Sequence, residues 1–322
     1  MKALITGGTG FIGSHLAEAL TAAGVEVYAL VRDPANIKFL RGTGVRVLPG
    51  DLTAVPAIPP GLDRVFHLAG LTKALQTSTY YTVNERGTAS LLDAVAARNP
   101  GVKVVVLSSL AACGPSDGVS GRRECDPPAP VSPYGKSKRG GEIEALSRTD
   151  RFSVTIIRVG VVFGPRDSDF LNFFRSIRRG ILPLFGRRIR PFSVCYVRDL
   201  VGAIRRASET ETTSGEIFNV GNAVPSSFEE IGRIAAGVLE RRVRRIIIPL
   251  TAVRTAALAS DAWSHWTKKP SIINRYKFVE LKQKGWTADM EKARLGLGFV
   301  AATSLEDGLR ETLRWYLDHS WL

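Results

Sequence analysis

The chain has 322 residues, 44% of them hydrophobic, and a formal net charge of +14. That length is ample for one large domain with a smaller partner. No window offers the ~20 uninterrupted apolar residues of a membrane span, so we expect no integral membrane segment. The N-terminus lacks a signal-peptide pattern, which predicts a cytoplasmic protein. Three scattered cysteines without metal-ligand spacing predict reduced thiols and no metal site.

Arginines carry much of the charge, in two groups at 175–190 and 241–245. Such an excess suggests an anionic ligand, a membrane surface or nucleic acid, and we interpret it as a solvated basic face. No helix-turn-helix, zinc or aromatic RNA-binding signature accompanies it, so we expect no nucleic-acid partner. We interpret the apolar run 246–248 as a buried strand flanked by arginines, with contact to a membrane surface as the alternative.

Short apolar strands alternate with helices in the first half of the chain. A glycine turn follows the first strand, and Gly24 stops the first helix. Ser132 and Pro133 are typical of a helix start, and that helix runs to 147. The predicted strands are 2–6, 25–31, 45–48, 64–68, 102–107 and 152–159, and the other predicted helices are 14–23 and 79–97. This alternation predicts an α/β fold with a doubly wound parallel Rossmann sheet.

The alternation loosens after Gly164. We expect loop and helix at 165–191, strands that return toward the sheet at 192–197 and 217–220, and mostly helix from 226 with a strand near 244–248. We therefore assign 1–164 plus 192–220 to the Rossmann domain, and 165–191 plus 221–322 to a smaller, mostly helical lobe. Three tryptophans of that lobe either pack its interior or line a pocket: Trp263, Trp266 and Trp286.

The glycine turn has the spacing of a dinucleotide site. Gly7, Gly10 and Gly13 let the backbone turn tightly and approach a pyrophosphate, and the helix N-terminus directs free amides at that anion. Because the turn follows a strand and opens a helix, it predicts cofactor binding rather than an ordinary tight turn. The other cofactor contacts that we expect are Phe11 and Ile12 in the turn, Asp51 and Leu52 near adenine, and Ala69, Gly70 and Asn84 farther along.

The end of the second strand bears on the choice between NADP and NAD. An acidic residue there would bind the ribose 2′-hydroxyl, whereas an arginine would accommodate a 2′-phosphate. Arg32 is the first charged residue after the strand and could form a bidentate pair with phosphate. Asp33 argues for NAD, but Pro34 predicts a turn that directs it elsewhere, so we favour NADP over NAD.

Tyr134 and Lys138 lie four residues apart on a predicted helix, hence on one face. A free tyrosine has a pKa of about 10, and a neighbouring ammonium lowers that value. A serine at the carboxyl end of a central strand, Ser108 or Ser109, can donate a hydrogen bond to a substrate oxygen. Together with the glycine turn, these residues predict proton transfer beside a nicotinamide.

With these residues, the sequence resembles the extended short-chain dehydrogenase/reductase family. The resemblance rests on GGTGFIG at 7–13, FHLAG at 66–70, VLSSLAACG at 106–114, PYGKSK at 133–138 and RVGVVFGPR at 158–166. It implies Ser109 rather than Ser108 as the catalytic serine, Tyr134 as acid/base, Lys138 as its partner and as a ribose contact, and a helix-bundle homodimer. Cys113 and Val159 depart from the family pattern and are expected to alter the substrate pocket.

The resemblance leaves three functions open. The first is an NAD(P)-dependent oxidoreductase that transfers hydride between nicotinamide and a carbonyl or secondary alcohol, as in the dihydroflavonol-reductase and 3β-hydroxysteroid-dehydrogenase-like branch. The second is a nucleotide-sugar epimerase or, with less support, a dehydratase, because Arg190 aligns with an arginine that binds the diphosphate in sugar-nucleotide relatives. The third is a non-enzymatic dinucleotide-binding protein. The expected partner is a small-molecule substrate, with Lys73 and Arg190 as candidate contacts.

Overall fold

A seven-stranded parallel sheet forms the centre of the larger lobe in the computed structural model, which describes residues 1–268 and 274–322. Its strand order is β10-β6-β5-β4-β1-β2-β3. The strands are β1 (Lys2–Thr6), β2 (Glu26–Val31), β3 (Arg46–Pro49), β4 (Arg64–His67), β5 (Lys103–Ser109), β6 (Ser153–Val159) and β10 (Glu216–Val220). The order reverses at β1, whose neighbours are β2 and β4, and ligands bind at such a switch point in open α/β sheets.

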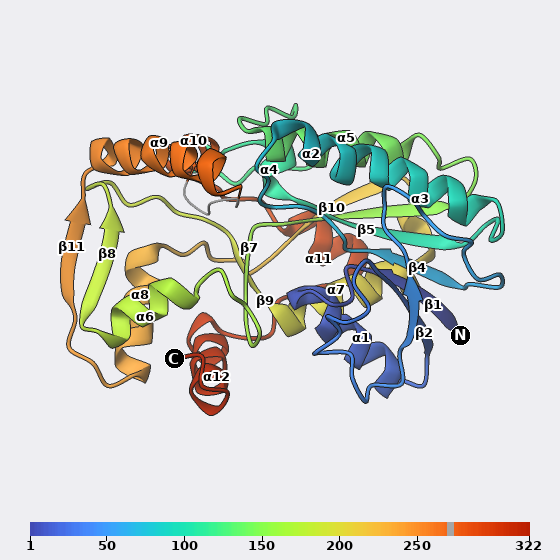
Figure 1. Cartoon of the computed structure of the whole chain (residues 1–322), viewed down its shortest axis with the longest axis horizontal. Helices are drawn as coiled ribbons and strands as arrows, with labels where there is room; N and C mark the ends of the chain where they lie inside the picture. Colours follow the sequence, from blue (N-terminus) through green and yellow to red (C-terminus); the bar gives the residue numbers. More distant parts are fainter. Residues whose placement is uncertain (269–273) are drawn as a thin grey trace.

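Helices cover both faces of this sheet (Figure 1), which confirms the predicted doubly wound Rossmann fold. On one face lie α1 (Phe11–Ala22), α7 (Val197–Glu209) and α11 (Glu291–Leu297); on the other lie α2 (Thr77–Tyr81), α3 (Gly87–Ala96) and α5 (Pro133–Leu146). The strands bury apolar side chains toward both layers, which explains their near-continuous hydrophobic runs. Short helical turns occur at α4 (Leu110–Cys113) and η2 (Glu211–Thr213).

The predicted helix at 79–97 is interrupted by a π-helical turn, η1 (Thr82–Arg86), between α2 and α3. Such turns are rare and often occur at functional sites. Gly141 of α5 packs against this turn so closely that an added Cβ would lie 2.3 Å from the carbonyl oxygen of Asn84. The turn thereby holds Asn84 against the helix that carries Tyr134.

The smaller lobe contains α6 (Leu171–Arg178), β8 (Ile181–Phe185), α8 (Phe228–Val238), β11 (Arg244–Ile248), α9 (Leu250–Thr267), α10 (Arg275–Leu281) and α12 (Leu305–Asp318). Its core combines aromatic side chains of α6, α8 and α12. A two-stranded ribbon of β7 (Val161–Phe163) and β9 (Val194–Tyr196) connects the lobes. Within the described part of the chain, no helix is long and apolar enough to cross a membrane.

Three expectations about the chain beyond Gly164 were wrong. The segment 165–191 contains strand β8 as well as loop and helix, and β9 pairs with β7 instead of returning to the central sheet. Strand β11 is not buried: Ile246 is 41% and Ile247 49% exposed. The physical reason is that β11 pairs only with β8 in a two-stranded sheet, so it lacks the second layer that would cover it.

A buried chain of hydrogen bonds crosses the larger lobe from β1 to α5. The Thr6 hydroxyl accepts from the Ala69 amide at 3.2 Å and bonds the His67 Nδ1 at 2.7 Å. The His67 Nε2 meets the Thr88 hydroxyl at 2.9 Å, and that hydroxyl donates to the Asn84 carbonyl at 2.8 Å. Because the Thr88 hydroxyl donates onward, His67 is the neutral Nε2–H tautomer and accepts at Nδ1.

A buried ion pair anchors the other side of α5. Both guanidinium contacts of Arg158 on β6 reach the Glu142 carboxylate, at 2.8 and 2.7 Å. The Ser108 hydroxyl donates to the same carboxylate at 2.6 Å. Despite burial, these donors hold the pKa of Glu142 below its ordinary value. Ser108 is therefore engaged in fixing α5 to the sheet.

His67 should make the fold sensitive to acid. Burial, helped by the positive charge of Lys138, lowers its pKa from 6.5 to about 3. Below pH 6.5 the unfolded chain takes up a proton that the folded protein refuses until about pH 3, so the free energy of unfolding falls by up to about 1.4 kcal/mol per pH unit for this group. Urea unfolding between pH 4 and about 7 measures this slope.

The variant His67→Gln is the matched comparison. It should be less stable than the native chain at neutral pH, because the Thr6 and Thr88 hydroxyls lose partners, and its stability should depend less steeply on pH. Equal pH slopes for the two proteins would show that His67 does not titrate in this way.

Candidate active site

The glycine turn between β1 and α1 is tightly packed. A Cβ added at Gly13 would lie 2.1 Å from the Gly7 carbonyl oxygen, and one at Gly7, whose φ is +74°, would lie 2.8 Å from the Ala69 amide. Gly10 is the exposed N-cap of α1 and supplies no side-chain cap to its first-turn amides. Free amides at a helix N-terminus suit a pyrophosphate, so these residues fit a dinucleotide. Phe11 and Ile12, both half-buried, form the start of α1.

The end of β2 presents a positive charge. The Arg32 side chain is 78% exposed, and its Nε lies 4.0 Å from the Asp51 carboxylate. Asp33 accepts a hydrogen bond from the Ala35 amide at 3.1 Å, within the turn made by Pro34. The carboxylate of Asp33 is thus engaged locally while the guanidinium of Arg32 remains open to solvent.

The remaining expected cofactor residues lie along the carboxyl ends of the strands. Asp51 caps a turn by accepting from the Thr53 amide at 2.8 Å, and Leu52 is buried. Gly70 faces the center of the site, where an added Cβ would lie 3.4 Å from the Asn84 Oδ1 and 3.5 Å from the Lys138 Nζ. The Asn84 side chain accepts a hydrogen bond from the Leu71 amide at 2.7 Å and donates to the Leu71 carbonyl at 3.1 Å. It also donates to the Ser137 hydroxyl at 2.9 Å.

Ser109, Tyr134 and Lys138 converge from β5 and α5. Ser109 ends β5, where its hydroxyl accepts from the Ala111 amide at 3.1 Å and lies near enough to the Tyr134 phenol to lower the pKa of that phenol. One turn farther along α5, the Lys138 Nζ donates to the Leu107 carbonyl at 2.7 Å. Ser132 caps α5 by accepting from the Gly135 amide at 3.1 Å, which fixes where the helix begins. The neighbouring Ser108 points to Glu142, so Ser109 is the serine at the site.

The pKa of Tyr134 differs from expectation. Burial raises it above the ordinary tyrosine value, and the nearby Ser109 hydroxyl only partly offsets this effect. Lys138 was expected to lower this pKa, but its ammonium bonds the Leu107 carbonyl, and burial lowers its own pKa to about 8. The nearby cation that does lower the pKa of Tyr134 is Lys277 on α10.

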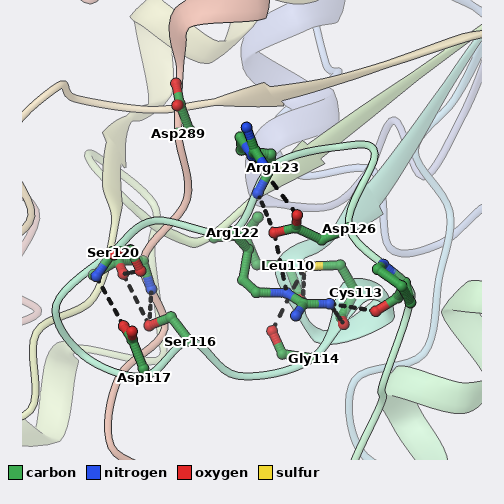
Figure 2. A network of polar contacts seen from close by, with 12 residues as sticks. Leu110, Cys113, Gly114, Ser116, Asp117, Ser120, Arg122, Arg123, Asp126 and Asp289 are labelled. Atoms are coloured by element: carbon green, nitrogen blue, oxygen red, sulfur yellow. Dashed lines mark hydrogen bonds and ion pairs between the residues drawn. The ribbon is translucent and has the colours of Figure 1, made fainter.

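The loop between Cys113 and Ser132 connects the serine strand to the tyrosine helix and is itself held by polar contacts (Figure 2). Arg122 donates to the backbone carbonyls of Cys113 and Pro127. The Ser116 hydroxyl bonds the Thr287 side chain at 2.8 Å, and the Arg122 amide donates to the Thr287 carbonyl at 2.9 Å. The loop therefore joins the site to the C-terminal segment around Thr287.

Helix α10 supplies site residues that the sequence analysis missed. Glu280 accepts from the Ser132 hydroxyl at 2.6 Å, and the Tyr276 and Thr77 hydroxyls lie 3.1 Å apart. Glu280 also pairs with Lys277 at 3.0 Å. Glu280 lies 148 positions from Ser132, and Tyr276 lies 199 positions from Thr77. No motif or spacing marks these long-range pairs, so the sequence offered no signal that would find them.

The two expected substrate contacts are both engaged with protein groups. The Lys73 Nζ lies 2.6 Å from Asp169. Arg190 donates from one nitrogen to the carbonyls of Phe185 and Arg188, at 2.9 and 3.0 Å. Burial, together with the charge of Arg188, lowers the pKa of Arg190. Its guanidinium thus stabilises the turn after β8.

The tryptophans separate into two classes. Trp286 packs in the core of the smaller lobe and donates from its indole to the Glu280 carbonyl at 3.0 Å, which agrees with a packing role. Trp263 and Trp266 on α9 are 62% and 76% exposed. For those two, neither the packing nor the pocket interpretation holds.

Known proteins with similar sequences include reductases. The chain is 32% identical to ceramide reductase from Caulobacter vibrioides, over 99% of this chain and 95% of the relative. It is 27% identical to 2-alkyl-3-oxoalkanoate reductase from Stenotrophomonas maltophilia, over 96% of this chain and 98% of the relative. Both relatives are enzymes, as is this chain.

Among solved structures, MoeE5 in complex with UDP-glucuronic acid and NAD superimposes with a TM-score of 0.79 and 28% identity, over 99% of this chain and 100% of that chain. The model of the NAD dependent epimerase/dehydratase family matches residues 3–221, which include the glycine turn and the Ser109, Tyr134 and Lys138 positions. This protein is a member of the NAD dependent epimerase/dehydratase family, with the extended short-chain dehydrogenase/reductase fold.

Proposed function

We propose that the protein is an NADP-linked reductase of a ketone that carries an acyl chain, with the corresponding secondary alcohol as product. The observation that carries this proposal is the convergence of Ser109, at the carboxyl end of β5, with Tyr134 and Lys138 on one face of α5, where Ser109 lies near enough to the phenol to affect its pKa. Similarity to ceramide reductase along nearly the whole chain supports an acyl-chain substrate.

When bound, the nicotinamide supplies the hydride. The chain's own residues handle the proton: Tyr134 gives its phenolic proton to the substrate oxygen, and Ser109 donates a hydrogen bond to the same oxygen. Because burial raises the pKa of Tyr134, the phenol stays protonated near neutral pH, which suits a proton donor and hence the reducing direction. Lys138, whose ammonium donates to the Leu107 carbonyl, would hold the cofactor ribose.

The preference for NADP is argued from the end of β2. Arg32 presents an exposed guanidinium, whereas the carboxylate of Asp33 accepts a backbone hydrogen bond in its own turn. A guanidinium forms strong paired hydrogen bonds with phosphate, and a carboxylate aimed elsewhere neither binds the 2′-hydroxyl nor repels a phosphate.

A nucleotide-sugar epimerase is the second candidate, favoured by the fit to MoeE5. The arginine expected at the diphosphate, Arg190, counts against it because it bonds the backbone of its own turn. An epimerase regenerates its cofactor in each cycle, so net oxidation of NADPH by ketones and no thermal shift with UDP-sugars support the reductase. Retained cofactor and stabilisation by UDP-sugars would favour the epimerase.

Tyr134→Phe tests the proton donor. Loss of a positioned acid should lower kcat by about 10²–10⁴-fold, while the affinity for NADPH changes little because the phenol is not needed to hold the dinucleotide. The assay is NADPH oxidation with a panel of acyl-chain ketones. Tyr80→Phe is the matched control, since Tyr80 stacks edge-on with Tyr134 at 6.2 Å yet bonds only backbone groups. Activity that survives in Tyr134→Phe would refute the assignment.

Arg32→Ala tests cofactor choice. Removal of a charged hydrogen-bond donor should weaken NADPH relative to NADH by roughly tenfold to a hundredfold. The measurement is kcat/KM for both cofactors. Arg46→Ala removes the same charge from neighbouring β3, where Arg46 pairs with Glu26, and should leave the ratio unchanged. An unchanged ratio in Arg32→Ala would exclude this residue as the determinant.

A further inference from the structure

Helix α9 turns a largely apolar face to solvent. The exposed residues of this helix whose side chains the structure describes are Thr251, Ala252, Arg254, Thr255, Ala256, Leu258, Ala259, Ala262, Trp263 and Trp266. At 100° per residue they form one continuous arc, and the buried Val253, Ala257 and Ser264 lie on the other side. A surface helix is expected to carry polar and charged residues on this side.

Three large apolar side chains stand on this arc among smaller ones. Trp263 and Trp266 are 62% and 76% exposed and meet edge-to-face with ring centroids 5.0 Å apart, and Leu258 is 52% exposed. Contiguous apolar surface of this kind marks an interaction site. Tryptophan is specifically enriched at membrane–water interfaces, where its ring lies among lipid headgroups.

The strand that precedes α9 also exposes apolar side chains. Ile246 and Ile247 of β11 are 41% and 49% exposed, and β11 leads through Pro249 directly into α9. Figure 1 shows β11 and the start of α9 at the outer edge of the smaller lobe, on the side away from the seven-stranded sheet. The ribbon of β8 and β11 and the start of α9 therefore lie apart from the Rossmann domain, and α9 runs from there back toward it.

The charge around this surface is positive. Between 250 and 284, the described residues include the cations Arg254, Lys268, Arg275, Lys277, Lys282 and Lys284, but only two acids, Asp261 and Glu280. Asp261 pairs with Arg275 and Glu280 with Lys277, so neither acid offsets the remaining cations. Two of the cations, Arg254 within the exposed arc and Lys268 directly after the helix, belong to the same element as the exposed tryptophans. Cations on a helix with exposed tryptophans are complementary to an anionic bilayer surface.

We propose that α9 docks the protein on an anionic phospholipid surface, with Trp263 and Trp266 inserted at headgroup level and the neighbouring cations contacting phosphates. A second copy of the chain fits this surface less well, because two like-charged faces would meet and the net charge is +14 on each copy. A helix that lies in the plane of the membrane–water interface can bind a membrane without crossing the bilayer.

Docking at α9 would bring the membrane close to the candidate active site. Helix α9 packs against α10, whose Tyr276 and Glu280 contact Thr77 and Ser132. A cavity of about 570 Å³, open to solvent, lies between α9 and α10. Its apolar lining residues include Leu250, Leu258, Phe278 and Val279, and its polar ones are Thr251, Arg254, Arg275 and Lys282. That cavity would receive the acyl chain of a substrate leaving the bilayer; this last step rests on the proposed reductase function.

Vesicle binding tests the proposal without substrate. The native chain should co-sediment with phosphatidylglycerol-containing vesicles, should bind phosphatidylcholine vesicles far more weakly, and should detach as salt is raised. Brominated lipid should quench its tryptophan fluorescence.

Trp263→Asp/Trp266→Asp should weaken binding to the anionic vesicles by about tenfold or more. Leu295→Asp/Val300→Asp adds the same charge at residues 69% and 65% exposed near α11 and should bind like the native chain.

Thermal unfolding and NADPH binding check that each variant is folded, and Trp263→Ser/Trp266→Ser replaces the double aspartate variant if it is not. Equal binding to both vesicle types, equal loss in both variants, or no binding by the native chain would overturn the proposal. So would a dimer that only the tryptophan variant dissociates. Tyr134→Phe should bind vesicles normally, which separates failure of docking from failure of the reductase assignment.

Discussion

The candidate site depends on a buried chain of polar contacts that ties the first strand to the catalytic helix. It runs from Thr6 through His67 and Thr88 to Asn84, whose side chain bonds Ser137. Buried polar groups are costly when a partner is missing, so such a chain tolerates few alternative arrangements. The π-helical turn brings Asn84 within reach of α5. The glycine turn at the end of β1 and the tyrosine on α5 are thereby fixed relative to each other.

A second set of contacts couples the two lobes at the same helix. Glu280 on α10 bonds the Ser132 hydroxyl that caps α5, while Thr287 bonds Ser116 in the loop that precedes α5. The cap decides where α5 begins, and four residues of helix then place Tyr134 and Lys138 on one face. Movement of the smaller lobe would first disturb the hydrogen bond between Glu280 and Ser132 at this cap. The lobe that would recognise substrate is thus mechanically linked to the proton donor.

The structure shows where several of the basic residues lie and what they contact. Arg158 forms a buried ion pair and Arg190 bonds the backbone of its own turn, whereas the segment that contains α9 and α10 carries more cations than acids and exposes apolar side chains. Charge and exposed tryptophan occur together at the outer part of the smaller lobe. An acyl-chain substrate and a membrane-facing helix are physically consistent, because long apolar chains partition into bilayers and reach an enzyme most readily from them.

The sequence alone determined the Rossmann architecture, because it follows from local periodicity. Short spacings also predicted the glycine turn and the pair Tyr134 and Lys138, and the family resemblance added Ser109; the structure brings these three side chains together between β5 and α5. It predicted that Pro34 would turn Asp33 away, and the structure shows this carboxylate bonded within its own turn. It could not place Glu280 beside Ser132, since 148 residues separate them. Nor could it tell that β11 is exposed: an apolar run looks the same whether or not a second layer covers it, and only tertiary packing decides that.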